Sequence, residues 1–193
     1  MNEFIIFPNI KGLEAMHMLG ASLMRSLYSA NPLIFLQGEL GAGKTTLVQG
    51  MAKELGVTDP VTSPTFTLEQ CYRIKPLQEL LHIDLYRFTN TFEADTFLND
   101  AREERSGICC VEWPERLSSV PKNAIVLNIK EQNPDSRTVN VTFDDTPLPS
   151  VYQIEAWYEE VQLPENVQRH CRAVADVTGK LADVLIATGT VVR

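Results

Sequence analysis

The chain has 193 residues, of which 44% are hydrophobic and 22% are charged, and its 17 basic and 25 acidic residues give a formal net charge of −8. This length suits one well-buried α/β domain with a small appendage, whereas two full domains would be crowded. The acidic balance argues against a surface that wraps a nucleic acid, because neutralising phosphates needs clustered Lys and Arg, so we expect any link to RNA to run through a partner.

The start of the chain and its cysteines favour a cytoplasmic protein. The first apolar run carries Glu3 and is too short for a signal sequence, and we see no membrane-spanning segment after it. The cysteines form no C-x-x-C pair, and together with three scattered histidines they show no zinc spacing. We therefore expect reduced cysteines that serve as small hydrophobic residues, namely Cys71, Cys109, Cys110 and Cys171.

Two strand–helix pairs are predicted at the beginning. Residues 3–7 are predicted to form a strand, followed by a helix from Leu13 to about Tyr28 that Asn31-Pro32 closes. The apolar run at 32–36 predicts a buried strand, and helical spacing of apolar residues predicts a second helix from about Lys44 to the residue before Gly56.

The turn between this second strand and helix matches the phosphate-binding pattern G-x-x-x-x-G-K-[ST], which requires a strand before it and a helix after it. Its glycines let backbone N–H groups converge on a polyphosphate and permit positive φ. The helix N-terminus favours an anion, the lysine reaches toward the β- and γ-phosphates, and the first threonine hydroxyl ligates magnesium. The residues expected to bind the nucleotide are Gly38, Glu39, Leu40, Gly41, Ala42, Gly43, Lys44 and Thr45, with Thr45 also on the metal.

The rest of the first 143 residues is predicted to alternate between strands and helices. An extended segment at 61–74 places Phe66, Leu68, Tyr72 and Ile74 on one side, and a turn follows at Lys75-Pro76. Further strands are predicted at 79–88, 108–113, 124–129 and 138–143, with one or two short helices in 88–107 and a loop at 130–137. This order predicts an α/β, P-loop NTPase-like fold: a mainly parallel sheet with helices on both faces and antiparallel additions.

Two acids compete to complete the magnesium site. A phosphate-loop nucleotidase needs a second metal partner on a neighbouring strand, usually an acid after four apolar residues. Glu112 follows "ICCV" and Asp84 follows "LLHI". We assign Glu112 as the metal ligand. We expect Asp84 to contact the groups that bind the metal, or to orient water. For each acid, the alternative is a plain surface carboxylate at a strand end.

Four motifs, taken in order and at their separations, carry a resemblance. They are "GELGAGKTTL", "SPTFTL" with a later Tyr, "HIDLYR" and "VEWPER". Over about residues 3–143 the chain resembles the bacterial TsaE family, the ATPase component of tRNA threonylcarbamoyladenosine synthesis. The phosphate loop alone would indicate only a nucleotide.

The resemblance implies ATP and Mg²⁺ as cofactors, with Thr45 and Glu112 on the metal and Lys44 and Thr46 on phosphate. It also implies that this ATPase works with the TsaD–TsaB pair, so that tRNA is reached only indirectly. Arg137 also resembles an arginine near the end of the family's sequences, and this resemblance implies that Arg137 lies near the nucleotide.

The resemblance further implies a mobile switch-like loop at 63–67 and a need for Asp84 and Trp113 in catalysis. Ser63 and Thr65 place two hydroxyls on a loop stiffened by Pro64, where one of them can sense a γ-phosphate, although an ordinary strand entry remains the alternative. Trp113 is expected either to pack in the core or to cover the metal site or a partner surface. Arg87 and Arg116 can supply charge to a transition state, although exposed arginines usually do not.

Three rival functions stay open at this point. A small-molecule kinase would use the same loop with "NDAREERSG" as a lid, but no acceptor motif is visible. A GTPase is disfavoured because the chain has no N-K-x-D to read guanine. A binding module would use the nucleotide only to order a partner surface.

The composition shifts at "DDTPLPS", which divides the chain into a phosphate-loop domain at 1–146 and a helical extension at 147–193. An apolar stripe predicts a helix beginning near Pro164, and it favours burial on the first domain, on a second copy or on a missing module. Its residues are Val167, Cys171, Val174, Thr178, Leu181 and Leu185. This stretch weakly resembles the opening helix of HD-type phosphohydrolases, with His170 as the early histidine, but no His-Asp doublet occurs, so no second active site is complete.

Overall fold

The structure is a computed structural model, and it describes residues 3–27, 31–75, 78–103, 105, 107–121, 124–143 and 151–187. The chain divides into two compact units, Met1–Asp145 and Thr146–Arg193. The predicted boundary at 146/147, the predicted helix end at Tyr28 and the turn residue Pro76 lie outside the described residues.

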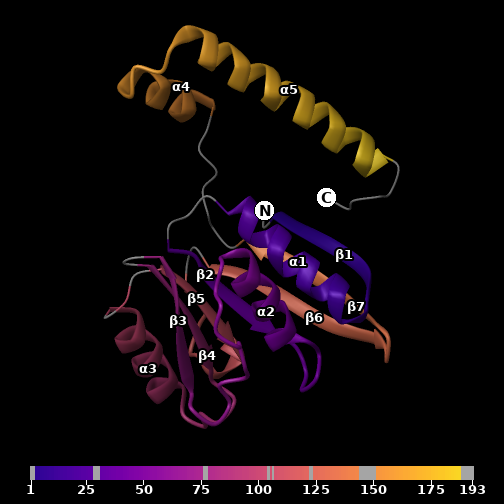
Figure 1. Cartoon of the computed structure of the whole chain (residues 1–193), viewed down its shortest axis with the longest axis vertical. Helices are drawn as coiled ribbons and strands as arrows, with labels where there is room; N and C mark the ends of the chain where they lie inside the picture. Colours follow the sequence, from indigo (N-terminus) through magenta and orange to yellow (C-terminus); the bar gives the residue numbers. More distant parts are fainter. Residues whose placement is uncertain are drawn as a thin grey trace. The chain divides into compact units, whose positions relative to one another are not determined.

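A sheet with the strand order β1-β7-β6-β2-β5-β4-β3 forms the centre of the first unit (Figure 1). Its middle strands run parallel, and they are β2 (Leu33–Gln37), β4 (Gln78–Asp84), β5 (Gly107–Glu112) and β6 (Ala124–Asn133). The antiparallel pairings come from β1 (Glu3–Lys11), β3 (Glu69–Lys75) and β7 (Ser136–Phe143). The predicted mainly parallel sheet with antiparallel additions is therefore confirmed.

Helices cover both faces of this sheet, as predicted. The alternation of side chains along β2 sends Ile34 and Leu36 into one hydrophobic cluster and Leu33 and Phe35 into the other. The first cluster contains the apolar faces of α1 (Gly12–Ser26) and α2 (Lys44–Glu54), and the second contains that of α3 (Thr91–Glu103). One helix, α3, therefore occupies the stretch for which one or two were predicted.

Two glycines let α1 and α2 pack backbone against backbone. A Cβ atom added at Gly20 would lie 2.3 Å from the Leu47 carbonyl oxygen, and one at Gly50 would lie 2.3 Å from the His17 carbonyl oxygen. The two helices pack closely on each other because neither position carries a side chain. This pair of helices supports the phosphate loop, since α2 begins at Lys44.

Three local predictions were wrong. The strand predicted at 79–88 is too long, because β4 ends at Asp84 and the Phe88 N–H donates to the Leu85 carbonyl in a turn. Residues 130–137 are not a loop, because β6 and β7 continue to a tight turn at Pro134-Asp135, and Arg137 lies in β7 opposite Glu131. Backbone pairing extends these strands even though their exposed ends lack alternating apolar residues. The segment 61–68 is not a strand, because the Leu68 N–H donates to the Pro64 carbonyl and closes a turn that leaves Phe66 86% exposed.

The second unit contains α4 (Val151–Glu160) and α5 (Glu165–Ala187), which confirms the predicted helix near Pro164. Arg172 of α5 binds the Glu155 carboxylate of α4 and lies 5.8 Å from the centre of the Tyr158 ring. The stripe residues Val167, Val174 and Leu181 are exposed. No helix among the described residues is both long and apolar enough to cross a membrane.

Candidate phosphate and magnesium site

The loop Gly38–Thr45 joins β2 to α2 at the carboxyl end of the parallel strands, where ligands bind in open α/β sheets. The strand before it and the helix after it are both present, as the pattern required. Gly43 has φ +107°, and a Cβ there would lie 3.0 Å from the Met16 Cε atom, while one at Gly38 would lie 2.6 Å from the Ile129 carbonyl oxygen. Only glycine fits these two positions, so the loop keeps a backbone-lined cradle.

Lys44 is 5% exposed and is held over this cradle. Its Nζ atom donates to the carbonyl oxygens of Gly38 at 2.7 Å and Glu39 at 3.0 Å, and it lies 4.0 Å from the centre of the Trp113 ring. Burial lowers the pKa of Lys44, and the nearby carboxylates of Glu112 and Asp84 oppose that shift. Its hydrogen-bond acceptors are neutral carbonyls, which leaves its charge available to an anionic ligand.

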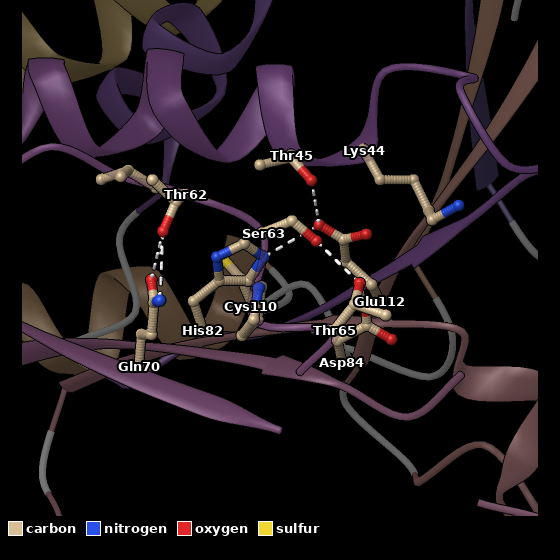
Figure 2. Close-up of polar contacts among 12 residues, drawn as sticks. Lys44, Thr45, Thr62, Ser63, Thr65, Gln70, His82, Asp84, Cys110 and Glu112 are labelled. Atoms are coloured by element: carbon tan, nitrogen blue, oxygen red, sulfur yellow. Dashed lines mark hydrogen bonds and ion pairs between the residues drawn. The ribbon is translucent and has the colours of Figure 1, made fainter. Parts of the chain in front are cut away.

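Glu112 ends β5 and contacts two other elements (Figure 2). Its Oε1 atom accepts a hydrogen bond from Thr45 Oγ1 at 2.7 Å and lies 2.9 Å from His82 Nε2. The side chains of Glu112 and His82 are both buried, which strengthens their electrostatic interaction. The structure thus joins the predicted metal ligands Thr45 and Glu112 across 67 residues of sequence.

Asp84 ends the neighbouring strand β4 and uses both carboxylate oxygens for other contacts. Oδ2 accepts a hydrogen bond from Thr65 Oγ1, and Oδ1 accepts one from the Tyr86 N–H at 2.8 Å. The Ser63 and Thr65 hydroxyl oxygens are 2.8 Å apart (Figure 2). Through Thr65, Asp84 therefore holds the predicted switch-like loop at the end of β4. Of the two acids, Glu112 keeps the freer carboxylate.

Trp113 leaves β5 in the left-handed conformation, with φ +61°, and precedes the 3₁₀ turn η1 (Pro114–Arg116). This conformation turns the indole toward the loop, where it meets the Lys44 ammonium. The ring also packs on Tyr86, with 5.0 Å between ring centroids. Trp113 packs against the second hydrophobic cluster as well, so it is partly a core residue and partly a cover for the loop lysine.

The remaining predicted residues lie around the loop at different depths. Ala42 is buried, while Glu39, Leu40 and Gly41 are exposed, and Thr46 lies half-buried in the first turn of α2. Arg137 reaches the loop from β7, with its Nε donating to the Ala42 carbonyl at 3.3 Å. Arg87, the last residue of "HIDLYR", is exposed, and the Arg116 guanidinium lies 5.9 Å from the centre of the Tyr86 ring.

His82 is the site residue that sequence reasoning missed. Its position was visible in "HIDLYR", because it stands two residues before Asp84 and therefore on the same face of β4. Nothing in the spacing alone indicated that its ring would contact Glu112 on the adjacent strand. That contact depends on the parallel register, in which Asp84 lies opposite Glu112.

The donor set fits magnesium better than a transition metal. A hydroxyl and a carboxylate are hard oxygen ligands, and Mg²⁺ is usually held by one or two carboxylates together with substrate phosphates and water. No group of three or more His, Cys, Asp or Glu side chains in the described part of the chain can hold a metal by itself. A cation here would therefore share its coordination with a phosphate bound in the glycine cradle.

Comparisons with known proteins found a family model, curated relatives and a solved structure that are similar to this chain. The family model described as "Threonylcarbamoyl adenosine biosynthesis protein TsaE" matches residues 10–139. The chain is 41% identical over 125 residues to the tRNA threonylcarbamoyladenosine biosynthesis protein TsaE of Synechocystis sp., covering 63% of this chain and 78% of that protein. It is 34% identical to the Bacillus subtilis protein of the same name over 63% of this chain and 76% of the relative. The crystal structure of Bacillus subtilis YdiB superimposes with a TM-score of 0.56 at 28% identity, covering 74% of this chain and 87% of that one.

Proposed function

This chain belongs to the TsaE family of tRNA threonylcarbamoyladenosine biosynthesis proteins, and we propose that it is the Mg²⁺-dependent ATPase of that synthesis. In this proposal it acts in the cytoplasm with a TsaD–TsaB pair that transfers the threonylcarbamoyl group. The contact between Thr45 and Glu112 carries the proposal, because it joins a phosphate loop to an acid at the end of a neighbouring strand.

Binding of the nucleotide is assigned to the loop and its lysine. The backbone N–H groups of a glycine-rich phosphate loop are suited to a polyphosphate, and α2, which begins at Lys44, would direct its positive end toward the same place. Lys44 would exchange its loop carbonyls for β- and γ-phosphate oxygens, which are stronger acceptors for an ammonium. The Trp113 ring would keep water away from that charge.

The two acids receive different roles. Thr45 and Glu112 would hold Mg²⁺, and when bound the ion would neutralise charge that develops on the phosphates. Asp84 is engaged by Thr65 and by the backbone of Tyr86, so it is better placed to position the 63–67 loop than to bind the metal directly. Thr65 would then sense the γ-phosphate from that loop.

The rival functions have less support. A kinase needs a pocket for its acceptor, and a cavity of about 140 Å³ is lined by residues that include Arg102, Gly107 and Cys109. Gly107 begins β5, whereas Glu112 ends it, so this cavity lies at the opposite end of the strand from the phosphate loop. A binding module without turnover differs from the proposal only in the rate of hydrolysis.

A reconstituted transfer reaction tests the proposal. The TsaD–TsaB pair, tRNA, ATP and the threonylcarbamoyl donor are incubated with and without this protein, and modified tRNA is counted over many turnovers. We expect sustained turnover only with the wild-type chain and ATP, and little turnover when the Lys44→Ala protein replaces the wild-type chain. Sustained turnover without the chain would contradict the proposal, as would tight tRNA binding by the isolated chain at physiological salt, given its net charge of −8.

A further inference from the structure

A buried histidine lies against the proposed metal-binding acid. In the parallel pairing of β4 and β5, His82 lies opposite Cys110, and Asp84 lies opposite Glu112. Because side chains alternate along a strand, His82, Asp84 and Glu112 share one face of the sheet. The His82 side chain is fully buried, and Figure 2 shows its ring turned toward Glu112.

The contact gives one carboxylate oxygen two donors from two different elements. Thr45 donates to Glu112 Oε1 from α2 at 2.7 Å, and His82 Nε2 lies 2.9 Å from the same atom on β4. Rotation of the carboxylate would break at least one of these bonds. Within the described part of the chain, Oε2 makes no such bond, so this oxygen remains available to a cation or a water molecule.

The other ring nitrogen argues against a role in packing alone. Among the described residues, the buried Nδ1 atom of His82 has no hydrogen-bond partner. A carboxylate only accepts, so Nε2 must carry the proton, which leaves Nδ1 as an unsatisfied acceptor in the neutral ring. Such a group costs stability, and an apolar residue would fill the space without that cost. A role for the Nε2–H donor explains why a histidine is suited to this position.

We propose that His82 is a positioning residue, which holds the Glu112 carboxylate in the orientation that lets Glu112 and Thr45 take the Mg²⁺ of a bound nucleotide. This inference rests on the proposed function. It differs from a catalytic role, because His82 touches the metal ligand and neither the nucleotide nor the reacting atoms. Removing a hydrogen-bond donor that contacts a metal ligand typically lowers metal affinity or activity ten- to a hundredfold.

Binding measurements without turnover test this role. The affinity for a non-hydrolysable ATP analogue is measured by calorimetry across a magnesium series and in EDTA, for wild type, His82→Leu and His82→Gln. Leucine removes the donor, while glutamine places an amide N–H near the position of Nε2. We expect equal affinities in EDTA for all three, about ten- to a hundredfold more Mg²⁺ required by His82→Leu, and a nearly normal requirement for His82→Gln.

His17→Leu is the matched control. His17 lies in α1, and its Nε2 atom is 3.3 Å from Gln49 Oε1, away from Glu112, so its loss should not change the magnesium requirement. If His82→Leu does not fold, His82→Asn replaces it, because the shorter amide corresponds to Nδ1 and does not reach Glu112.

The outcomes separate the two proposals. A folded His82→Leu or His82→Asn protein with the wild-type magnesium requirement would overturn the positioning role, and so would a His82→Gln protein as defective as His82→Leu. A wild-type protein that binds no nucleotide would overturn the proposed function itself, and the role of His82 with it.

Discussion

The Lys44 ammonium lies between two loop carbonyls and the Trp113 ring, where water screens its charge only weakly. Lys44→Ala would remove a charge-assisted contact worth about 1.5–3 kcal/mol, so we expect ATP affinity to fall about ten- to a hundredfold in calorimetry. Lys53→Ala is the control, since Lys53 is exposed at the other end of the same helix. Equal affinity of Lys44→Ala and wild type would show that the loop does not use its lysine.

Glu112 and Asp84 should fail in different ways. Because Glu112 contacts Thr45, and because its Oε2 atom accepts no hydrogen bond from the described residues, Glu112→Ala should raise the magnesium concentration needed for half-maximal turnover. Because Asp84 holds Thr65, Asp84→Asn should lower the maximal rate with less change in that requirement. Steady-state ATPase assays over a magnesium series distinguish the two, and reversed phenotypes would exchange their roles.

Among the structural elements, the α1–α2 pair depends on its two glycines. Alanine is favoured over glycine in a helix by about 1 kcal/mol, but at Gly50 the new Cβ would meet the backbone of α1, and such overpacking costs about 1–3 kcal/mol or more. We therefore expect Gly50→Ala to lower the free energy of unfolding by about 2 kcal/mol in urea titrations. Gly179→Ala in α5 is the control, because its Cβ would meet nothing within 4 Å, and this change should not destabilise its helix. A Gly50→Ala protein as stable as wild type would mean that the helices separate at little cost.

The 61–68 segment is the element that we expect to couple nucleotide to motion. Thr65→Val would remove the bond to Asp84, so amide hydrogen exchange around the turn closed by Leu68 should quicken, and turnover should fall while nucleotide binding persists. Thr67→Val is the matched control, since among the described residues its hydroxyl donates to the Pro64 carbonyl at 3.5 Å and not to Asp84. Unchanged exchange in Thr65→Val would show that Asp84 does not hold the loop.

The elements near the site were predictable where short-range rules govern them. The phosphate-loop pattern from Gly38 to Thr45 predicts a strand before it and a helix after it. The four apolar residues before Glu112 likewise indicate a buried strand. The apolar pattern alone predicted a strand at Pro64–Leu68, whereas the family resemblance implied a loop at 63–67. A backbone hydrogen bond and a left-handed Leu68 produce a turn there. The His82–Glu112 contact was missed because it depends on the register between two strands 30 residues apart. Long-range pairing of this kind leaves no local pattern.

At the scale of the whole molecule, the candidate site and the second unit are separate parts of the chain. Every residue assigned to the nucleotide or metal lies in Met1–Asp145, and the TsaE family match ends at residue 139. The second unit holds its own contacts between α4 and α5, including the ion pair of Arg172 with Glu155. Val174, Val177 and Leu181 of α5 form an exposed apolar surface, and none of these residues is assigned to the nucleotide or the metal.

A chain ending at Thr146 tests this separation. Because the phosphate loop, Glu112 and Asp84 all lie within the first unit, we expect the shortened protein to bind ATP with an affinity close to that of the full chain. An apolar helix face exposed to water favours association, so the oligomeric state or the stability should change instead. Light scattering and ATP titration of both proteins measure these effects, with circular dichroism as the check on folding. Loss of ATP binding in a shortened chain that still folds would show that the second unit contributes to the site.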